Sequence, residues 1–184
     1  MVLFRQIVFT VLALGGLVLS ANAAELSDIT NYREYSAKFS SSGQPTKAQM
    51  ELLKSEGFER IIYIAFTNGS TALANEDVIA RELGMEYFHI PVVWDKPTVS
   101  DFYAFADIMK RYPDKRSLLH CKVNYRATAF SFLYRVIYQD VPVAEAKADL
   151  NSIWSPDETW RKLIFSILEE NGKSAQCEGC NWDN

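Results

Sequence analysis

The stretch that decides the fold is residues 117–130, SLLHCKVNYRATAF. It opens with a short apolar run, Ser117–His120, typical of a buried strand. It closes in a helical pattern whose apolar residues share one face: Phe130, Leu133, Tyr134 and Ile137. Between strand and helix lies a short segment that we call the Cys121 loop, residues 121–126. Such a loop can turn several backbone N–H groups inward, and the N-terminus of the following helix adds the positive end of its dipole. The local pattern therefore predicts a site that can hold a tetrahedral oxyanion.

Outward from this stretch, short apolar strands alternate with amphipathic helices and no repeats occur. Further strands are expected at 58–66 and 86–93. Helices are expected from Thr46 to the stop at Gly57, over 75–83 and 98–111, after the Cys121 loop, from Pro142, and from the start signal at 155–158. Strands separated by helices imply right-handed crossovers and a mainly parallel sheet of four to five strands flanked by helices. In such an α/β sheet the ligand site lies beyond the C-terminal ends of the strands.

The Cys121 loop carries groups suited to nucleophilic chemistry on an oxyanion. The positive field of inward N–H groups and a helix N-terminus stabilises a thiolate at Cys121, and the thiolate is the nucleophilic form of cysteine. Arg126 presents a planar fork that can hold two oxyanion oxygens. Backbone N–H groups of Lys122, Val123, Asn124, Tyr125 and Arg126 complete the predicted cradle. The alternative is a buried structural cysteine with a surface arginine, since a Cys-x4-Arg spacing also occurs by chance.

Other polar residues near the predicted strand ends are candidates for supporting roles. Asp95, in the segment after the strand at 86–93, is the candidate general acid, or else a turn residue before Pro97. Asp101 is better explained as the capping partner of Thr98. His120 is expected to orient the loop and tune the thiol, or to be a satisfied strand-end histidine. Lys122 either favours anionic substrates or is a solvated cation, and His89 is expected to be structural.

Several segments together resemble one known family. They are Ser41-Ser42-Gly43-Gln44-Pro45, Gly57-Phe58, Ile90-Pro91-Val92 with Pro97-Thr98, and the Cys121 loop. This set is similar to the beta-lactamase-hydrolase-like, dual-specificity-type bacterial phosphatases, over roughly residues 35 to 140. The resemblance implies a three-layer cysteine-phosphatase fold and hydrolysis of a phosphorylated small molecule or protein through a phosphocysteine intermediate, with Cys121, Arg126 and Asp95 as catalytic residues.

Two positions depart from the family pattern, and two other functions stay open. Asn124 stands where the family usually has Gly, and Asn tolerates a left-handed backbone. Ala127 stands where related enzymes have a hydroxyl that helps the thiolate leave, and Thr128 is one position too late to be assumed equivalent. A non-catalytic module that binds phosphate or a phosphopeptide is therefore one alternative. A rhodanese-like sulfurtransferase is the other, because its loop from Cys to Arg has the same length.

The N-terminal residues predict export. Arg5 precedes an apolar run that is followed by Ala21-Asn22-Ala23, so residues 1–23 are expected to be a signal peptide cleaved before Ala24. An uncleaved anchor is the alternative, but the run is shorter than the roughly 20 residues that a membrane span requires. We therefore expect one phosphatase-like domain at 24–184, with a flexible tail at 175–184, no stable membrane insertion after cleavage, and a periplasmic or secreted location.

Charge and cysteine content argue against a nucleic-acid partner and against a metal cofactor. The net charge is −4, and no basic cluster marks a nucleic-acid surface. Cys177 and Cys180 are expected to form a small local disulfide, which leaves Cys121 as the free thiol. Read as zinc ligands, the pair is only half a site, so we expect no metal and no cofactor.

Overall fold

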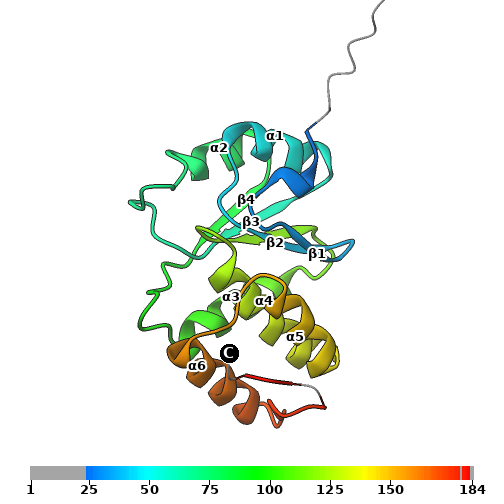
Figure 1. The fold of residues 1–184 in the computed structure, drawn as a ribbon. Coiled ribbons are helices and arrows are strands. Elements are labelled where there is room, and N and C mark those ends of the chain that lie inside the picture. The colour runs from blue at the N-terminus through cyan, green and yellow to red at the C-terminus, as the bar shows by residue number, and fades with distance from the viewer. Residues whose placement is uncertain (1–23, 179, 183–184) are drawn as a thin grey trace, which may run out of the picture.

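The computed structural model describes residues 24–178 and 180–182 (Figure 1). The predicted signal peptide at 1–23 lies outside the described residues. A central five-stranded sheet has the order β1-β2-β5-β3-β4. Its strands are β1 (Arg33–Ser36), β2 (Phe39–Ser42), β3 (Arg60–Tyr63), β4 (Glu86–His89) and β5 (Ser117–His120). Only the β1–β2 pairing is antiparallel among these strands, so the predicted mainly parallel α/β sheet is confirmed.

Helices cover both faces of the sheet and complete three layers (Figure 1). On one face lie α1 (Lys47–Ser55) and α2 (Glu76–Glu82), near the short 3-10 helix η1 (Leu26–Asp28). On the other lie α3 (Val99–Arg111), α4 (Tyr125–Tyr138), α5 (Val143–Asn151) and α6 (Glu158–Glu170). The capping boxes Thr46–Gln49 and Thr98–Asp101 form as predicted and fix the starts of α1 and α3.

The strands are shorter than the apolar runs that predicted them. The runs at 58–66 and 86–93 give strands of four residues each, β3 and β4. After β3 the chain continues as buried coil through Ile64 and Ala65, and Val92 is likewise buried beyond β4. The ends of both runs are exposed, since Phe66 and Val93 are 41% and 40% accessible. The apolar runs therefore marked where the two strands lie, whereas ladder pairing decided where each strand ends.

The hairpin of β1 and β2 was not predicted from the sequence pattern. Three of the four β2 residues are serines, which carry little strand signal. All four β2 residues are nevertheless buried, because β2 lies between β1 and β5 in the sheet. Its position beside β5 brings the segment after β2 against the Cys121 loop.

The register of the sheet aligns the last residues of four strands. Ser42 pairs with His120, His120 with Tyr63, and Tyr63 with His89. All four lie at the C-terminal ends of their strands, at one edge of the parallel sheet. This is the edge at which ligands bind in open α/β sheets.

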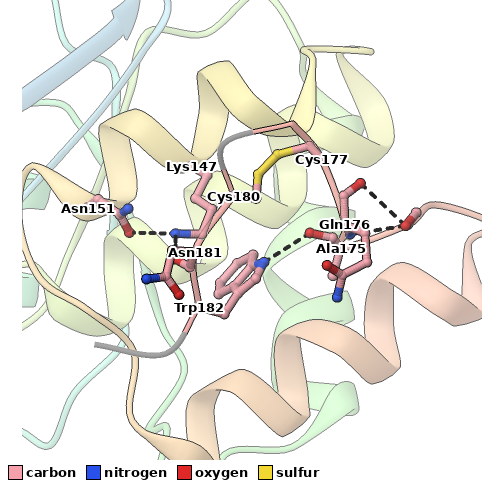
Figure 2. The surroundings of a disulfide bond; sticks show 9 residues. Lys147, Asn151, Ala175, Gln176, Cys177, Cys180, Asn181 and Trp182 are labelled. Carbon is pink, nitrogen blue, oxygen red and sulfur yellow. Dashed lines mark hydrogen bonds between the residues drawn. A yellow bond between two sulfur atoms is a disulfide. The ribbon is translucent and has the colours of Figure 1, made fainter.

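A disulfide joins Cys177 to Cys180 in the C-terminal tail, and Figure 2 shows how its surroundings pack. The Trp182 ring meets Phe132 of α4 and Phe165 of α6 edge-on, at 5.7 and 5.1 Å between ring centroids. Trp182 Nε1 donates to Ala175 O at 2.9 Å, and Lys147 Nζ donates to Asn181 O at 2.5 Å. The tail is thereby attached to the helical layer that holds α4.

Candidate active site

The Cys121 loop is held from behind by the segment that follows β2. Cys121 N donates to Ser42 O at 3.2 Å, and Gln44 N donates to Lys122 O at 3.1 Å. Gly43 forms a bridge with Val123, and a Cβ at Gly43 would lie 2.9 Å from Thr30 Cβ and 3.0 Å from Lys122 O. A glycine is therefore required for this close approach. The Ser-Gly-Gln-Pro stretch noted in the sequence is thus a scaffold for the loop.

Asn124 shapes the entry of the loop into α4. Its backbone is left-handed, with φ 71° and ψ 0°, and it occupies the N-cap position of α4. Its Nδ2 donates to Asn31 O at 2.5 Å, and Asn31 Nδ2 donates to Val123 O at 3.0 Å. Asn124 therefore replaces glycine in a left-handed position and adds a side-chain bond to the N-terminal segment.

Cys121 and Arg126 line the same cavity. This cavity has a volume of about 310 Å³ and is lined by Trp94, Cys121, Lys122, Val123, Tyr125 and Arg126. Cys121 is fully buried and is a free thiol, so it belongs to the floor of the cavity rather than its rim. Arg126 Nε is buried and has no hydrogen-bond partner within the described residues. The arginine thus keeps donor capacity at the cavity, as an oxyanion-binding residue requires.

Aromatic rings form one wall of the cavity. The Arg126 guanidinium carbon lies 5.2 Å from the centroid of the Trp94 ring, a cation–π distance. Tyr125 stacks on Trp154 at 5.0 Å with an interplanar angle of 6°. Trp160 Nε1 donates to Trp94 O at 3.0 Å and so fixes the backbone of this wall from below. Trp94 thus lies against the Arg126 guanidinium, and its backbone is fixed by Trp160.

Thr128 does not supply the hydroxyl that Ala127 lacks. Its Oγ1 lies 2.9 Å from Asn124 O and 3.1 Å from Tyr125 O, as a donor inside the first turn of α4. The same Oγ1 accepts from Trp154 Nε1 at 3.1 Å. The Thr128 hydroxyl is therefore occupied in holding the helix start to the aromatic wall.

His120 lies in a buried polar cluster beside Cys121. Its Nε2 is 3.2 Å from Glu76 Oε1, and its ring stacks on Tyr63 at 4.7 Å and 18°. Burial, together with the negative charges of Glu76 and Cys121, raises the pKa of Tyr63 to about 12. His89 stacks on the other face of Tyr63 at 5.3 Å, and its Nε2 lies 2.6 Å from Ala65 O.

The remaining predicted site residues make no described side-chain bond to Cys121. Asp95 is exposed in a turn directly after Trp94. Lys122 is exposed on the loop, while Val123 and Tyr125 are half-buried cavity residues. Asp101 completes the capping box of α3, as predicted.

Sequence reasoning missed several residues that the fold brings to the site. Glu76 begins α2, where an acidic residue already has a local explanation in the helix dipole. Asn31 is 93 residues from Asn124 along the chain, yet the two are joined by a hydrogen bond. Trp154 is likewise distant in sequence and stacks on Tyr125 of the loop. No local pattern marks such long-range partners.

No metal centre or membrane span is found in the described part of the chain. Residues 24–178 and 180–182 contain no group of three or more His, Cys, Asp or Glu placed to hold a metal ion. Across the same residues, every helix falls short of the length and apolar character that a membrane crossing requires.

Among known proteins, similarity to this chain was found in solved structures. No protein-family model matches the chain, and no curated protein matches its sequence. Among solved structures, a Shewanella putrefaciens CN-32 protein described as "Putative phosphatase (DUF442)" is 30% identical, with a TM-score of 0.73. That alignment covers 79% of this chain and 96% of the other.

Two more distant structures share the fold. PTPMT1 in complex with PI(5)P is 15% identical, with a TM-score of 0.66 over 77% of this chain and 96% of that chain. TpbA of P. aeruginosa in complex with pTyr is 14% identical, with a TM-score of 0.57 over 79% and 93%. The fold is thus the one that these phosphatase structures share. On the 30% identity over nearly the whole length of the Shewanella protein, the chain belongs to the cysteine-phosphatase-like family.

Proposed function

We propose that this protein is a cysteine-dependent phosphomonoesterase. The observation that carries the proposal is that Cys121 and Arg126 line one cavity at the N-terminus of α4, where Arg126 Nε is buried without a partner in the described chain. The similar Shewanella protein is described as a putative phosphatase, and the more distant PTPMT1 and TpbA were solved with PI(5)P and pTyr. These findings support a phosphorylated substrate for this chain as well.

In the proposed first step, the Cys121 thiolate attacks phosphorus and forms an S–P bond while the ester P–O bond breaks. Arg126 and the backbone N–H groups of residues 122–126 stabilise the charge on the equatorial oxygens. Asp95 gives its proton to the leaving oxygen, so the alcohol departs neutral. In the second step Asp95 takes a proton from water, the hydroxide attacks phosphorus, and the S–P bond breaks to release phosphate and the thiolate.

Asp95 is exposed in the turn directly after Trp94, which lines the cavity, and the proposal requires this turn to bring the Asp95 carboxylate to the bound ester. Asp101 offers a matched control, because it is also an aspartate of the 94–101 segment but caps α3. Asp95→Asn is expected to lower kcat by about 10² to 10⁴, and Asp101→Asn to leave kcat nearly unchanged. An unaltered pH-rate profile in Asp95→Asn removes Asp95 from the mechanism.

The primary test is release of phosphate from p-nitrophenyl phosphate by the purified protein. Cys121→Ser should abolish turnover, because a serine hydroxyl is not ionised in this field as a thiol is. Arg126→Lys should also lose most of the activity, since an ammonium cannot reproduce the two-oxygen contact of a guanidinium. Full activity in Cys121→Ser would overturn the proposal.

A second candidate function is a non-catalytic phosphate or phosphopeptide binder. Ala127 favours it, because the neighbouring Thr128 hydroxyl is already engaged. Phosphate-dependent thermal stabilisation that persists in Cys121→Ser, with no turnover by the parent protein, decides for this function. Consumption of thiosulfate and cyanide without phosphate release decides instead for the rhodanese-like alternative.

We further propose, from the sequence motifs, that the chain belongs among the beta-lactamase-hydrolase-like phosphatases and acts outside the cytoplasm. Expression of the full chain followed by N-terminal sequencing of the exported protein tests whether the protein is exported and cleaved. A new N-terminus at Ala24 is expected. Retention of Met1 in the purified protein contradicts cleavage.

A further inference from the structure

We infer that Glu76 is a positioning residue that acts through His120 to stabilise the Cys121 thiolate. The inference rests on the proposed function, for which it supplies a residue of the same site. His120 directly precedes Cys121 and is fully buried. Its Nε2 lies 3.2 Å from Oε1 of Glu76, whose side chain is only 4% exposed. Neither ring nitrogen makes an aligned hydrogen bond within the described chain, so the contact rests on distance and becomes an ion pair when the imidazole is protonated.

Glu76 is itself held in place by two side chains. Gln44 Nε2 donates to Glu76 Oε1 at 2.9 Å, and Tyr87 OH donates to Oε2 at 3.5 Å. The backbone of Gln44 is bonded to Lys122 O. Glu76 is therefore connected to the Cys121 loop from two sides, through His120 and through Gln44.

The other groups around His120 do not compensate a charge on its ring. Tyr63 stacks on it and is neutral, because its pKa is about 12. Burial and the charge of Glu76 also raise the pKa of Tyr87, which keeps that phenol neutral. His89 lies beyond Tyr63, while the charges of Cys121 and Arg126 reach the cluster from the Cys121 loop. Glu76 is the carboxylate within ion-pair distance of His120 in the described part of the chain.

The direction in which the Glu76 charge affects the Cys121 thiolate can be tested. A buried carboxylate beside an imidazole favours the protonated ring, and an imidazolium next to Cys121 favours the thiolate. Glu76 by itself, acting directly, repels the thiolate. Removal of the Glu76 charge therefore destabilises the thiolate if the effect passes through His120, and stabilises it if the effect is direct.

The experiment measures the rate of Cys121 alkylation by iodoacetamide from pH 4 to pH 9, read by mass spectrometry. Cys121 is the free thiol of the chain, since Cys177 and Cys180 are bonded to each other. In Glu76→Gln the midpoint of the rate profile should move up by about one pH unit, with an about tenfold slower rate below the midpoint. Asp77→Asn is the matched control. It removes a neighbouring charge of α2 that instead pairs with Arg81 at 2.8 Å, and no shift is expected.

A midpoint that stays or moves down in Glu76→Gln overturns the inference. His120→Asn supplies an independent variant: it should raise the midpoint on its own, and adding Glu76→Gln to it should raise the midpoint no further. A further rise in the double variant overturns the route through His120. Alkylation needs no turnover, so a protein without phosphatase activity that shows the predicted shift refutes the proposed function alone. An active protein without the shift refutes this inference alone.

Discussion

The left-handed backbone of Asn124 gives the sharpest quantitative prediction for the loop. Asn124→Ala removes the hydrogen bond from Nδ2 to Asn31 O and leaves an alanine with a left-handed backbone at φ 71°, which no side-chain hydrogen bond stabilises. Asn124→Gly removes the same bond but relieves the backbone. The two variants therefore separate the contribution of the hydrogen bond from the contribution of the backbone conformation.

Two contributions set the expected magnitudes. Loss of the hydrogen bond costs about 0.5–1 kcal/mol, the lower part of the usual range, because Asn31 is exposed and water can replace the donor. An alanine with a left-handed backbone costs a further ~1–2 kcal/mol. Asn124→Ala should thus lose about 1.5–3 kcal/mol of unfolding free energy, equivalent to a fall in Tm of about 3–12 °C, whereas Asn124→Gly should lose about 0.5–1 kcal/mol.

Urea unfolding followed by tryptophan fluorescence measures both variants. Asn75 is a matched control, because it also has a left-handed backbone at a helix N-cap, with φ 56°, and makes no side-chain capping bond. Asn75→Ala should show the backbone cost alone, about 1–2 kcal/mol. If Asn124→Gly is as destabilising as Asn124→Ala, the backbone argument is wrong and another contact of Asn124 holds the loop.

Three further predictions concern the body of the protein. Trp160→Ala should lower the free energy of unfolding in urea by about 3–5 kcal/mol, because Trp160 is fully buried and its Nε1 donates to Trp94 O. A loss smaller than that caused by Tyr112→Ala, at an exposed position, contradicts this prediction. Burial raises the pKa of Tyr35 to about 12 from its ordinary 10.0, so stability that is fully present below pH 10 should fall as the pH rises from 10 to 12. Tyr35→Phe should flatten that fall, and an unchanged slope refutes the assignment. Reduction of the Cys177–Cys180 disulfide should cost at most about 2 kcal/mol because the ring that it closes is short, less than the roughly 3 kcal/mol expected for Trp182→Ala.

Several features could be predicted from the sequence because they depend on neighbours along the chain. The capping boxes at Thr46 and Thr98, the stop at Gly57 and the strand Ser117–His120 are set by short-range hydrogen bonds and backbone conformations. The loop between β5 and α4 is likewise local, since an apolar strand, a short turn and an amphipathic helix follow one another directly. The α/β class and the place of the Cys121 loop came from this local order.

What the sequence by itself determined was therefore the series of elements and the chemistry carried by the loop. Only the tertiary structure decided which distant groups surround that loop. The serine-rich β2 inserts beside β5, which brings Gly43 and Gln44 to the loop, and the arrangement of α2 brings Glu76 to His120. Such contacts depend on strand order and register, and a period of hydrophobic residues reports that a face is buried but not which partner it meets.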